Sequence, residues 1–274
     1  MQSKVKIAFI GGGNMAQALI GGLAGKLTAA NNIHVVDIND AALAALRDKF
    51  AVTTATMVGE TVAAADVIVL AVKPQQMREV VATLEPRLSQ QLVLSIAAGI
   101  RAADLSRWLG GHTAIVRTMP NTPALVGKGI TGAVAMSGVS AEQIQLADAI
   151  LRAVGDTVWL DDEGKIDAVT ALSGSGPAYV FYFIEAMQAA AVELGLTEAQ
   201  GRELAQATFA GAAELAIRSD EPVSLLRERV TSKGGTTYAA LTSMEASGVK
   251  AAIVKALHAA AARGKALGDE FGKD

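Results

Sequence analysis

Two short stretches of the chain place glycines where backbone N–H groups could come close to a ligand. The first is "GGGNMA", residues 11–16, which follows the apolar run "KVKIAFI". The second is "SKGGTT", residues 232–237, near the end of the chain. Glycine allows the backbone to turn tightly, and a helix that begins at such a turn offers unpaired N–H groups to an anion. Each stretch is therefore a candidate anion-binding site.

The first stretch matches the dinucleotide fingerprint G-x-G-x-x-G/A through Gly11, Gly13 and Ala16. Gly11 permits the tight turn, Gly13 lets a pyrophosphate approach the backbone, and Ala16 lets the helix pack closely on the sheet. A glycine turn that binds no ligand would have the same local pattern. The order of strand, helix and second strand around the motif favours a dinucleotide instead.

Asp37 ends a predicted strand over residues 33–37. A carboxylate at this place can bind the 2′-hydroxyl of an adenosine ribose and repel a 2′-phosphate. The following residues "IND" supply no arginine that would neutralise that phosphate. These residues alone therefore favour NAD over NADP. Capping of the next helix by Asp37 or Asn39 is a second interpretation, and it does not exclude the first.

Three further turns follow predicted strands: "AVKP" at 71–74, "AAG" at 97–99, and "MPNTP" at 119–123. Ligands of open α/β sheets bind at the carboxyl ends of the strands, where these turns lie. Asn121 could hydrogen-bond a carboxamide or an ordered water. A rigid turn between Pro120 and Pro123 explains the same residues equally well.

The elements that must position these residues change in character at residue 160. Before it, apolar runs rich in Val and Ile alternate with segments of helical spacing, which predicts a parallel sheet covered by helices on both faces. The predicted strands are 4–10, 33–37, 66–72, 91–97, 113–119, 129–136 and 156–160. The predicted helices between them include 14–27, 40–49, 75–85 and 140–153.

After residue 160, apolar residues recur every three or four positions, which predicts helices only. Helices near 177–194 and 197–218 are apolar around much of their circumference, so they must bury more than one face. We therefore expect an α/β fold: a Rossmann-type parallel-sheet domain over residues 1–160, and an all-α domain over 161–274 through which the protein forms oligomers.

Composition excludes several other classes of protein. The 274 residues are 51% apolar and include no cysteine, which excludes disulfides and thiolate metal sites. The three histidines, His34, His112 and His258, are scattered, and no metal site is predicted. The net charge of −3 indicates no nucleic-acid partner. No uninterrupted apolar run of membrane-spanning length and no signal-peptide pattern occur, so we expect no membrane partner and a cytoplasmic location.

Several stretches together resemble pyrroline-5-carboxylate reductase, the last enzyme of proline biosynthesis. They are "FIGGGNMAQALIGGL", "AVKPQQM", "SIAAGI", "MPNTPALVGKGITG", "TALSGSGPAYVFYFIEAM" and "VTSKGGTT". They occur in the order of that family and span residues 5–265. The resemblance implies reduction of 1-pyrroline-5-carboxylate to L-proline by hydride transfer from NADPH or NADH. It also implies a homodimer through the helical domain, with dimers often assembling into a decamer.

The resemblance also implies roles for particular residues. The loop near the end of the chain would bind the substrate carboxylate and ring through Ser232, Gly234, Gly235, Thr236 and Thr237. The cofactor would contact Ile10, Gly11, Gly12, Gly13, Asn14, Met15, Asp37, Ala71, Val72, Lys73, Pro74, Ala97, Ala98 and Gly99, with Asn121 near the nicotinamide. The hydroxyl of Thr237 is our candidate catalytic group, as a hydrogen-bond partner of the ring nitrogen.

Three residues depart from the family pattern. Lys233 stands where many members have proline, which adds a charge to a less rigid loop; we expect its side chain to face solvent. Val58 stands where an asparagine often contacts the cofactor. Asp37 stands where members that prefer NADPH have smaller or neutral residues, so the preference between NADPH and NADH stays open.

Because the two glycine stretches lie in different predicted domains, we expect the active site to form between domains, with one domain from each subunit of a dimer. A β-hydroxyacid dehydrogenase would share this layout, but the helical part has no lysine in a GxxxK-like setting on its first long helix. A non-catalytic dinucleotide sensor and a pyridoxal-binding module are further alternatives. The first would show no turnover, and the second would need a poised lysine that we cannot identify.

Overall fold

The computed structural model describes residues 4–273, which pack as two compact units. The first unit is residues 4–175 together with residues 260–273, and the second is residues 176–259. The last strand, β8, ends at Trp159, and helical segments follow it. The predicted change from strands to helices near residue 160 is therefore confirmed, while the limits of the functional domains stay a prediction.

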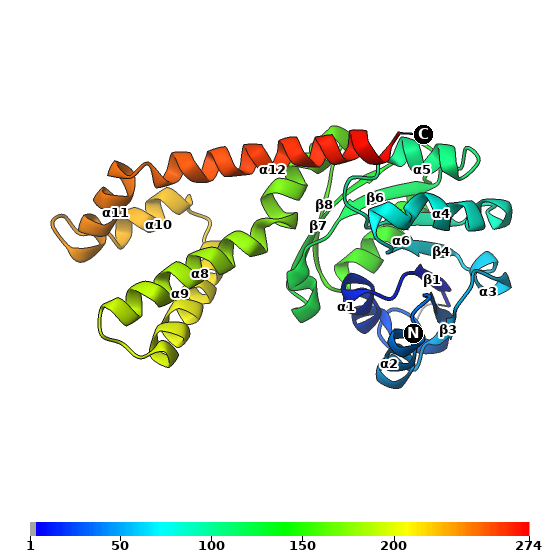
Figure 1. The fold of residues 1–274 in the computed structure, drawn as a ribbon, viewed down its shortest axis with the longest axis horizontal. Helices are drawn as coiled ribbons and strands as arrows, with labels where there is room; N and C mark the ends of the chain where they lie inside the picture. The colour runs from blue at the N-terminus through cyan, green and yellow to red at the C-terminus, as the bar shows by residue number, and fades with distance from the viewer. Residues whose placement is uncertain (1–3, 274) are drawn as a thin grey trace. The chain divides into compact units, whose positions relative to one another are not determined.

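The first unit contains, among its described residues, a sheet of eight strands in the order β3-β2-β1-β4-β5-β6-β7-β8 (Figure 1). From β3 through to β6 all neighbours are parallel. The chain runs from β1 outward to β3 and then returns to the other side of β1 to form β4. The strands are β1 Ile7–Ile10, β2 Ile33–Val36, β3 Thr53–Ala55, β4 Val67–Leu70, β5 Leu92–Ser95, β6 Ile115–Met119, β7 Gly129–Ala135 and β8 Gly155–Trp159.

Two features of the sheet differ from the sequence prediction. The short edge strand β3 was not predicted, because two of its three residues are threonines and it has no apolar run. Strand β7 runs antiparallel to β6. Only a short turn around the 3-10 helix Thr122–Val126 joins these two strands, whereas a parallel connection needs a crossover of about a dozen residues or more. The predicted fold class, a Rossmann-type sheet with an all-α part, is confirmed.

Helices cover both faces of this sheet. Strand β1 is buried throughout, with Ile7 and Phe9 in one core cluster and Ala8 and Ile10 in the other. This division follows from the alternation of side chains along a strand. The first cluster includes side chains of α1, α2 and α6, and the second includes those of α4 and α5. These helices are α1 Asn14–Leu23, α2 Asp40–Phe50, α3 Glu60–Ala63, α4 Pro74–Leu84, α5 Ala102–Trp108 and α6 Ala141–Arg152.

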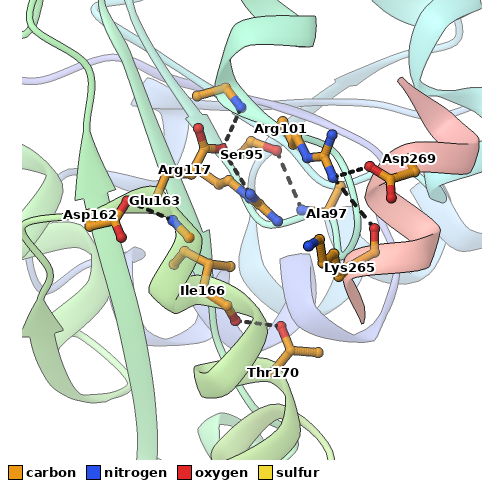
Figure 2. Close-up of polar contacts among 12 residues, drawn as sticks. Ser95, Ala97, Arg101, Arg117, Asp162, Glu163, Ile166, Thr170, Lys265 and Asp269 are labelled. Atoms are coloured by element: carbon orange, nitrogen blue, oxygen red, sulfur yellow. Dashed lines mark hydrogen bonds and ion pairs between the residues drawn. The ribbon is translucent and has the colours of Figure 1, made fainter. Parts of the chain in front are cut away.

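A partly buried ion pair joins the central sheet to the segment that follows it (Figure 2). Arg117 on β6 is 4% exposed and donates from Nη1 to Oε1 of Glu163 at 2.8 Å. The same carboxylate oxygen accepts the backbone N–H of Ala102, the first residue of α5, at 2.7 Å. Because a buried guanidinium needs a partner, Glu163 holds both β6 and the start of α5. The helical segments α7 Ile166–Val169 and the π-helix Thr170–Gly174 follow.

The second unit is built from helices, and α8 and α9 lie side by side within it (Figure 1). The rings of Phe183 and Phe209 pack across this pair at 6.4 Å between centroids. Many apolar side chains of the unit are exposed in the single chain, including Phe181 at 60% and Tyr182 at 72%. The helices are α8 Gly176–Glu193, α9 Glu198–Arg218, α10 Val223–Arg229, α11 Thr236–Ala246 and α12 Val249–Phe271, whose last turns belong to the first unit.

Such exposed apolar helices call for a partner surface, because contiguous apolar patches are rare on soluble monomers. Among residues 4–273, no helix combines the length and the apolar character that crossing a membrane requires.

Candidate active site

The strand order brings the predicted cofactor residues together at one edge of the sheet. They follow β1, β2, β4, β5 and β6, which are neighbours and parallel, so their carboxyl ends share one edge. Strand β1 lies between β2 and β4. Strands β2 and β3 follow on one side of β1, and β4 and the later strands follow on the other, so the strand order reverses at β1. Open α/β sheets bind their ligands at such a switch point.

Gly11 forms the tight turn that the sequence predicted. Its φ angle is +101°, and its N–H donates to the carbonyl of Val36 at 2.8 Å. A Cβ at this position would lie 2.6 Å from the carbonyl oxygen of Ala71, just after β4. Backbone atoms cannot move aside as a flexible side chain could. The turn therefore requires glycine for both its conformation and its packing.

The carboxylate of Asp37 is directed at this turn. Its Oδ2 accepts the N–H of Gly12 at 2.7 Å, and its Oδ1 accepts the N–H of Asn39 at 2.9 Å. The cap of α2 is Asn39, whose side chain accepts the N–H of Ala42 at 3.1 Å. Of the two capping residues considered from the sequence, Asn39 is therefore the one used. Asp37 is left facing the glycine turn.

Helix α1 begins here with its N-terminus open. Gly13 is its N-cap residue, and no side chain caps the first turn. A Cβ on Gly13 would meet no atom within 4 Å, so the space beside it is free for a ligand. Unpaired N–H groups at a helix N-terminus carry a partial positive charge that suits a phosphate. These features fit the pyrophosphate of a dinucleotide.

The remaining turns at this edge are made of small or rigid residues. Lys73 and Pro74 begin α4, and Gly99 has φ +74° in the turn after β5. Asn121 is 8% exposed, and its side-chain oxygen accepts the N–H of Ile130 at 3.0 Å. That contact fixes the start of β7 and supports the rigid-turn interpretation of the loop. A contact of Asn121 with a nicotinamide stays a prediction.

The loop of residues 232–237 lies in the second unit, between α10 and α11. Gly234 has φ +75°, and the N–H of Gly235 donates to the carbonyl of Ser232 at 3.0 Å. A Cβ on Gly235 would lie 2.5 Å from the hydroxyl oxygen of Ser232. Both glycines therefore serve the tight turn, the first through its conformation and the second through the nearby hydroxyl.

Helix α11 also begins without a side-chain cap. Gly235 is its N-cap residue, and neither Ser232 nor Thr236 accepts a capping hydrogen bond. Because no side chain caps this helix, the first N–H groups of α11 can bind an anion. Thr237 is half-buried in the first turn, while Lys233 is exposed as expected.

The sequence analysis did not identify two residues that pack against the turn after β5. Leu267 and Phe271, in the last turns of α12, pack against Gly99. The spacing of Gly264, Gly268 and Gly272 by four residues would have indicated a close contact on that face of the helix. Among residues 4–273, no group of three or more histidines, aspartates and glutamates is arranged to hold a metal ion.

Comparison with known proteins supports this description of the two parts. Residues 6–99 match the family model described as NADP oxidoreductase, coenzyme F420-dependent, and residues 163–267 match that of pyrroline-5-carboxylate reductase dimerisation. The fold and the site thus define a dinucleotide-dependent oxidoreductase with a helical dimerisation part.

Individual relatives match over the whole chain. A pyrroline-5-carboxylate reductase of Pseudomonas aeruginosa is 46% identical over 99% of this chain and 100% of its own. The structure of one from Coxiella burnetii has a TM-score of 0.91 at 41% identity, covering 97% and 99% of the two chains. That of Plasmodium falciparum pyrroline carboxylate reductase with NADP bound has a TM-score of 0.88 at 31% identity, covering 98% and 100%. This chain belongs to the pyrroline-5-carboxylate reductase family, which confirms the resemblance seen in the sequence.

Two neighbouring substitutions in the glycine turn should change the stability of the protein by different amounts. Gly11→Ala should lower the free energy of unfolding by roughly 2–4 kcal/mol, through a strained φ angle and a clash with Ala71. Gly13→Ala should change it by about 1 kcal/mol at most, because the new methyl group meets open space. The same methyl group should weaken NADPH binding about tenfold. Chemical denaturation and NADPH fluorescence titration measure both effects. A stable Gly11→Ala variant would contradict the packing argument.

Proposed function

We propose that this chain catalyses the NAD(P)H-dependent reduction of 1-pyrroline-5-carboxylate to L-proline, the last step of proline biosynthesis. One observation carries the proposal: two helices, α1 and α11, begin at glycine turns with no side-chain cap. Each reactant carries an anionic group that suits such a helix end. The pyrophosphate of the dinucleotide matches the first, and the substrate carboxylate matches the second.

The residues at the sheet edge fit the dinucleotide. The N–H groups after Gly13 would hold the pyrophosphate, and Asp37 would face the adenosine ribose. The small residues Ala97 and Ala98 would leave room for a ring or a ribose. When bound, NAD(P)H supplies the hydride for the imine carbon. The protein would then hold the nicotinamide and the imine in the orientation that hydride transfer requires. It would also stabilise the charge on the substrate and the proton on its ring nitrogen.

The loop in the second unit fits the substrate. The turn at Gly234 and Gly235 leads directly into the N-terminus of α11. Its N–H groups and the hydroxyl of Ser232 or Thr236 would bind the carboxylate, which sets the position of the five-membered ring. A bound carboxylate at the positive end of a helix is stabilised by the helix dipole.

Thr237 would act on the ring nitrogen. This nitrogen must end the reaction protonated, and a hydroxyl can both accept and donate a hydrogen bond. A half-buried hydroxyl in the first turn of α11 would lie beside a ring whose carboxylate is bound at the same helix end. Thr237 would then steady the protonated imine, which is the form that accepts hydride readily.

The proposed reaction can be followed with NADPH that carries deuterium at both C4 positions. Reaction with 1-pyrroline-5-carboxylate should give L-proline with one deuterium on its δ carbon, the former imine carbon. Mass spectrometry and NMR of the product locate the label. Proline without deuterium, or no proline with either deuterated NADPH or deuterated NADH, would reject the proposed hydride transfer.

Removal of the Thr237 hydroxyl should slow the reaction. Thr237→Ala should lower kcat/KM roughly 10- to 1000-fold, given the usual contribution of positioned proton-handling groups. Thr237→Ser keeps the hydroxyl and is the matched control, so it should retain most of the activity. Steady-state kinetics with 1-pyrroline-5-carboxylate as the varied substrate measures this. An alanine variant with wild-type kinetics would remove Thr237 from the mechanism.

Removal of the Asp37 charge should change the cofactor preference. Asp37→Asn keeps an oxygen that can accept the N–H of Gly12 but removes the repulsion of a 2′-phosphate. The ratio of kcat/KM for NADPH to that for NADH should rise roughly tenfold. Parallel kinetics with the two cofactors give this ratio, and an unchanged ratio would show that Asp37 does not face the adenosine ribose.

The protein forms a homo-oligomer in this proposal, with a dimer through the helices of the second unit as its basic form and a decamer of five such dimers as a further expectation. The exposed apolar side chains of α8 and α9 would form the dimer contact. Phe181→Asp places a charge among them and should give inactive monomers, because the site would then lack the partner subunit's part. Analytical ultracentrifugation and kinetics of the same sample test this. A fully active monomer would contradict the proposed assembly.

A further inference from the structure

The turn after β5, residues 97–99, lies directly against the last turns of α12. A Cβ on Gly99 would come within 3.1 Å of the Cβ of Leu267 and within 3.2 Å of the ring of Phe271. Gly99 is buried, and Phe271 also packs against the core cluster beside this turn. These contacts all lie within the first unit. The C-terminal part of α12 therefore packs directly against the turn of residues 97–99.

Polar contacts fasten the same helix end to the residues that follow the turn (Figure 2). Arg101 donates from Nη2 to Oδ1 of Asp269 at 2.5 Å. A Cβ on Gly268 would lie 3.0 Å from two nitrogens of the Arg101 guanidinium, so the guanidinium lies against the helix at a residue without a side chain. Arg107 donates to the carbonyl of Gly272 at 2.8 Å. The end of α12 is thus held by both charge and packing.

The turn is held at its far end as well. Glu163 accepts the N–H of Ala102 at 2.7 Å, just after Arg101. The pKa of Asp269 lies below its ordinary value, chiefly because the Arg101 side chain donates to it. A carboxyl group with a lowered pKa is ionised at neutral pH, so it can pair with the guanidinium of Arg101 there.

A turn of two alanines and a glycine cannot hold its own shape. Alanine and glycine have little side chain to pack, and glycine loses the most conformational freedom when it is ordered. Binding to a mobile turn must include the cost of ordering it, and a turn that is ordered in advance avoids that cost. The contacts from α12 supply such ordering.

We propose that the last turns of α12, through Leu267, Asp269 and Phe271, position the turn of residues 97–99 for binding of NAD(P)H. These are positioning residues, because they act through Gly99 and Arg101 and are not placed against the cofactor. The inference rests on the proposed function, which assigns the turn to the cofactor. It adds that the C-terminal end of the chain sets cofactor affinity.

The test compares substitutions on one helix. Phe271→Ala removes the ring beneath Gly99, and Phe271→Leu keeps an apolar side chain there. Asp269→Asn weakens the ion pair with Arg101. The matched control is Glu270→Gln, since Glu270 pairs with Arg263 on the same helix and has no contact with the turn among those described. Each full-length variant is assayed for its KM values and for direct NADPH binding by fluorescence, with unfolding followed by circular dichroism.

Phe271→Ala should raise the KM and Kd for NADPH roughly 3- to 30-fold, with the KM for 1-pyrroline-5-carboxylate unchanged. Phe271→Leu should restore most of the affinity. Asp269→Asn should raise both constants roughly two- to fivefold, while Glu270→Gln should match the wild type. A general loss of stability would not produce this split between the two substrates. If Phe271→Ala is unfolded at the assay temperature, the comparison of Asp269→Asn with Glu270→Gln decides.

The proposal is overturned if Phe271→Ala and Asp269→Asn bind NADPH as tightly as the wild type, or if Glu270→Gln weakens binding equally. These outcomes are distinct from failure of the proposed function. A wild-type protein that binds NADPH without reducing the imine would reject that function, yet the binding titrations would still test the role of α12. A wild-type protein that binds neither NADPH nor NADH would reject both.

Discussion

The close approach of two backbone segments, at Gly11 and Ala71, is the constraint on which the site depends. Gly11 leaves β1 with a positive φ angle, and the carbonyl of Ala71 occupies the place that a Cβ would take, so only glycine fits. Helix α1 begins just after this turn, and no side chain caps its first N–H groups. The turn also sets Gly12 where its N–H meets Asp37. One steric condition thus brings the uncapped start of α1 and the carboxylate of Asp37 together.

Much of the fold could be predicted from the sequence because the spacing of apolar residues matches the side chains that are buried in the structure. Strand β1 is buried on both faces and reads as a continuous apolar run. Strand β3 could not be predicted, since an edge strand of three residues with two threonines has almost no hydrophobic signal. The antiparallel direction of β7 follows from the short turn between β6 and β7, which is too short for a parallel crossover. The length of this turn could have been read from the sequence, but the prediction did not use it.

The parts of the candidate site that could be predicted are the turns whose backbone conformation favours glycine. The turns at Gly11 and Gly234 have positive φ angles, and the sequence marked both. Contacts between distant segments were less accessible. The packing of Phe271 on Gly99 joins positions that no local pattern relates, although glycines spaced by four on α12 indicate a close neighbour. The use of the Asn121 oxygen by Ile130 also depends on tertiary structure.

The central claim is that the dinucleotide edge and the loop of residues 232–237 serve one reduction of a cyclic imine. The most direct measurement is the loss of absorbance at 340 nm when the protein meets 1-pyrroline-5-carboxylate with NADPH or NADH, beside a parallel assay of NAD(P)⁺ reduction by 3-hydroxy acids. The account predicts rapid oxidation of the reduced cofactor with the imine and no turnover of the hydroxy acids. Turnover of a hydroxy acid alone, or tight NADPH binding without any turnover, would contradict it.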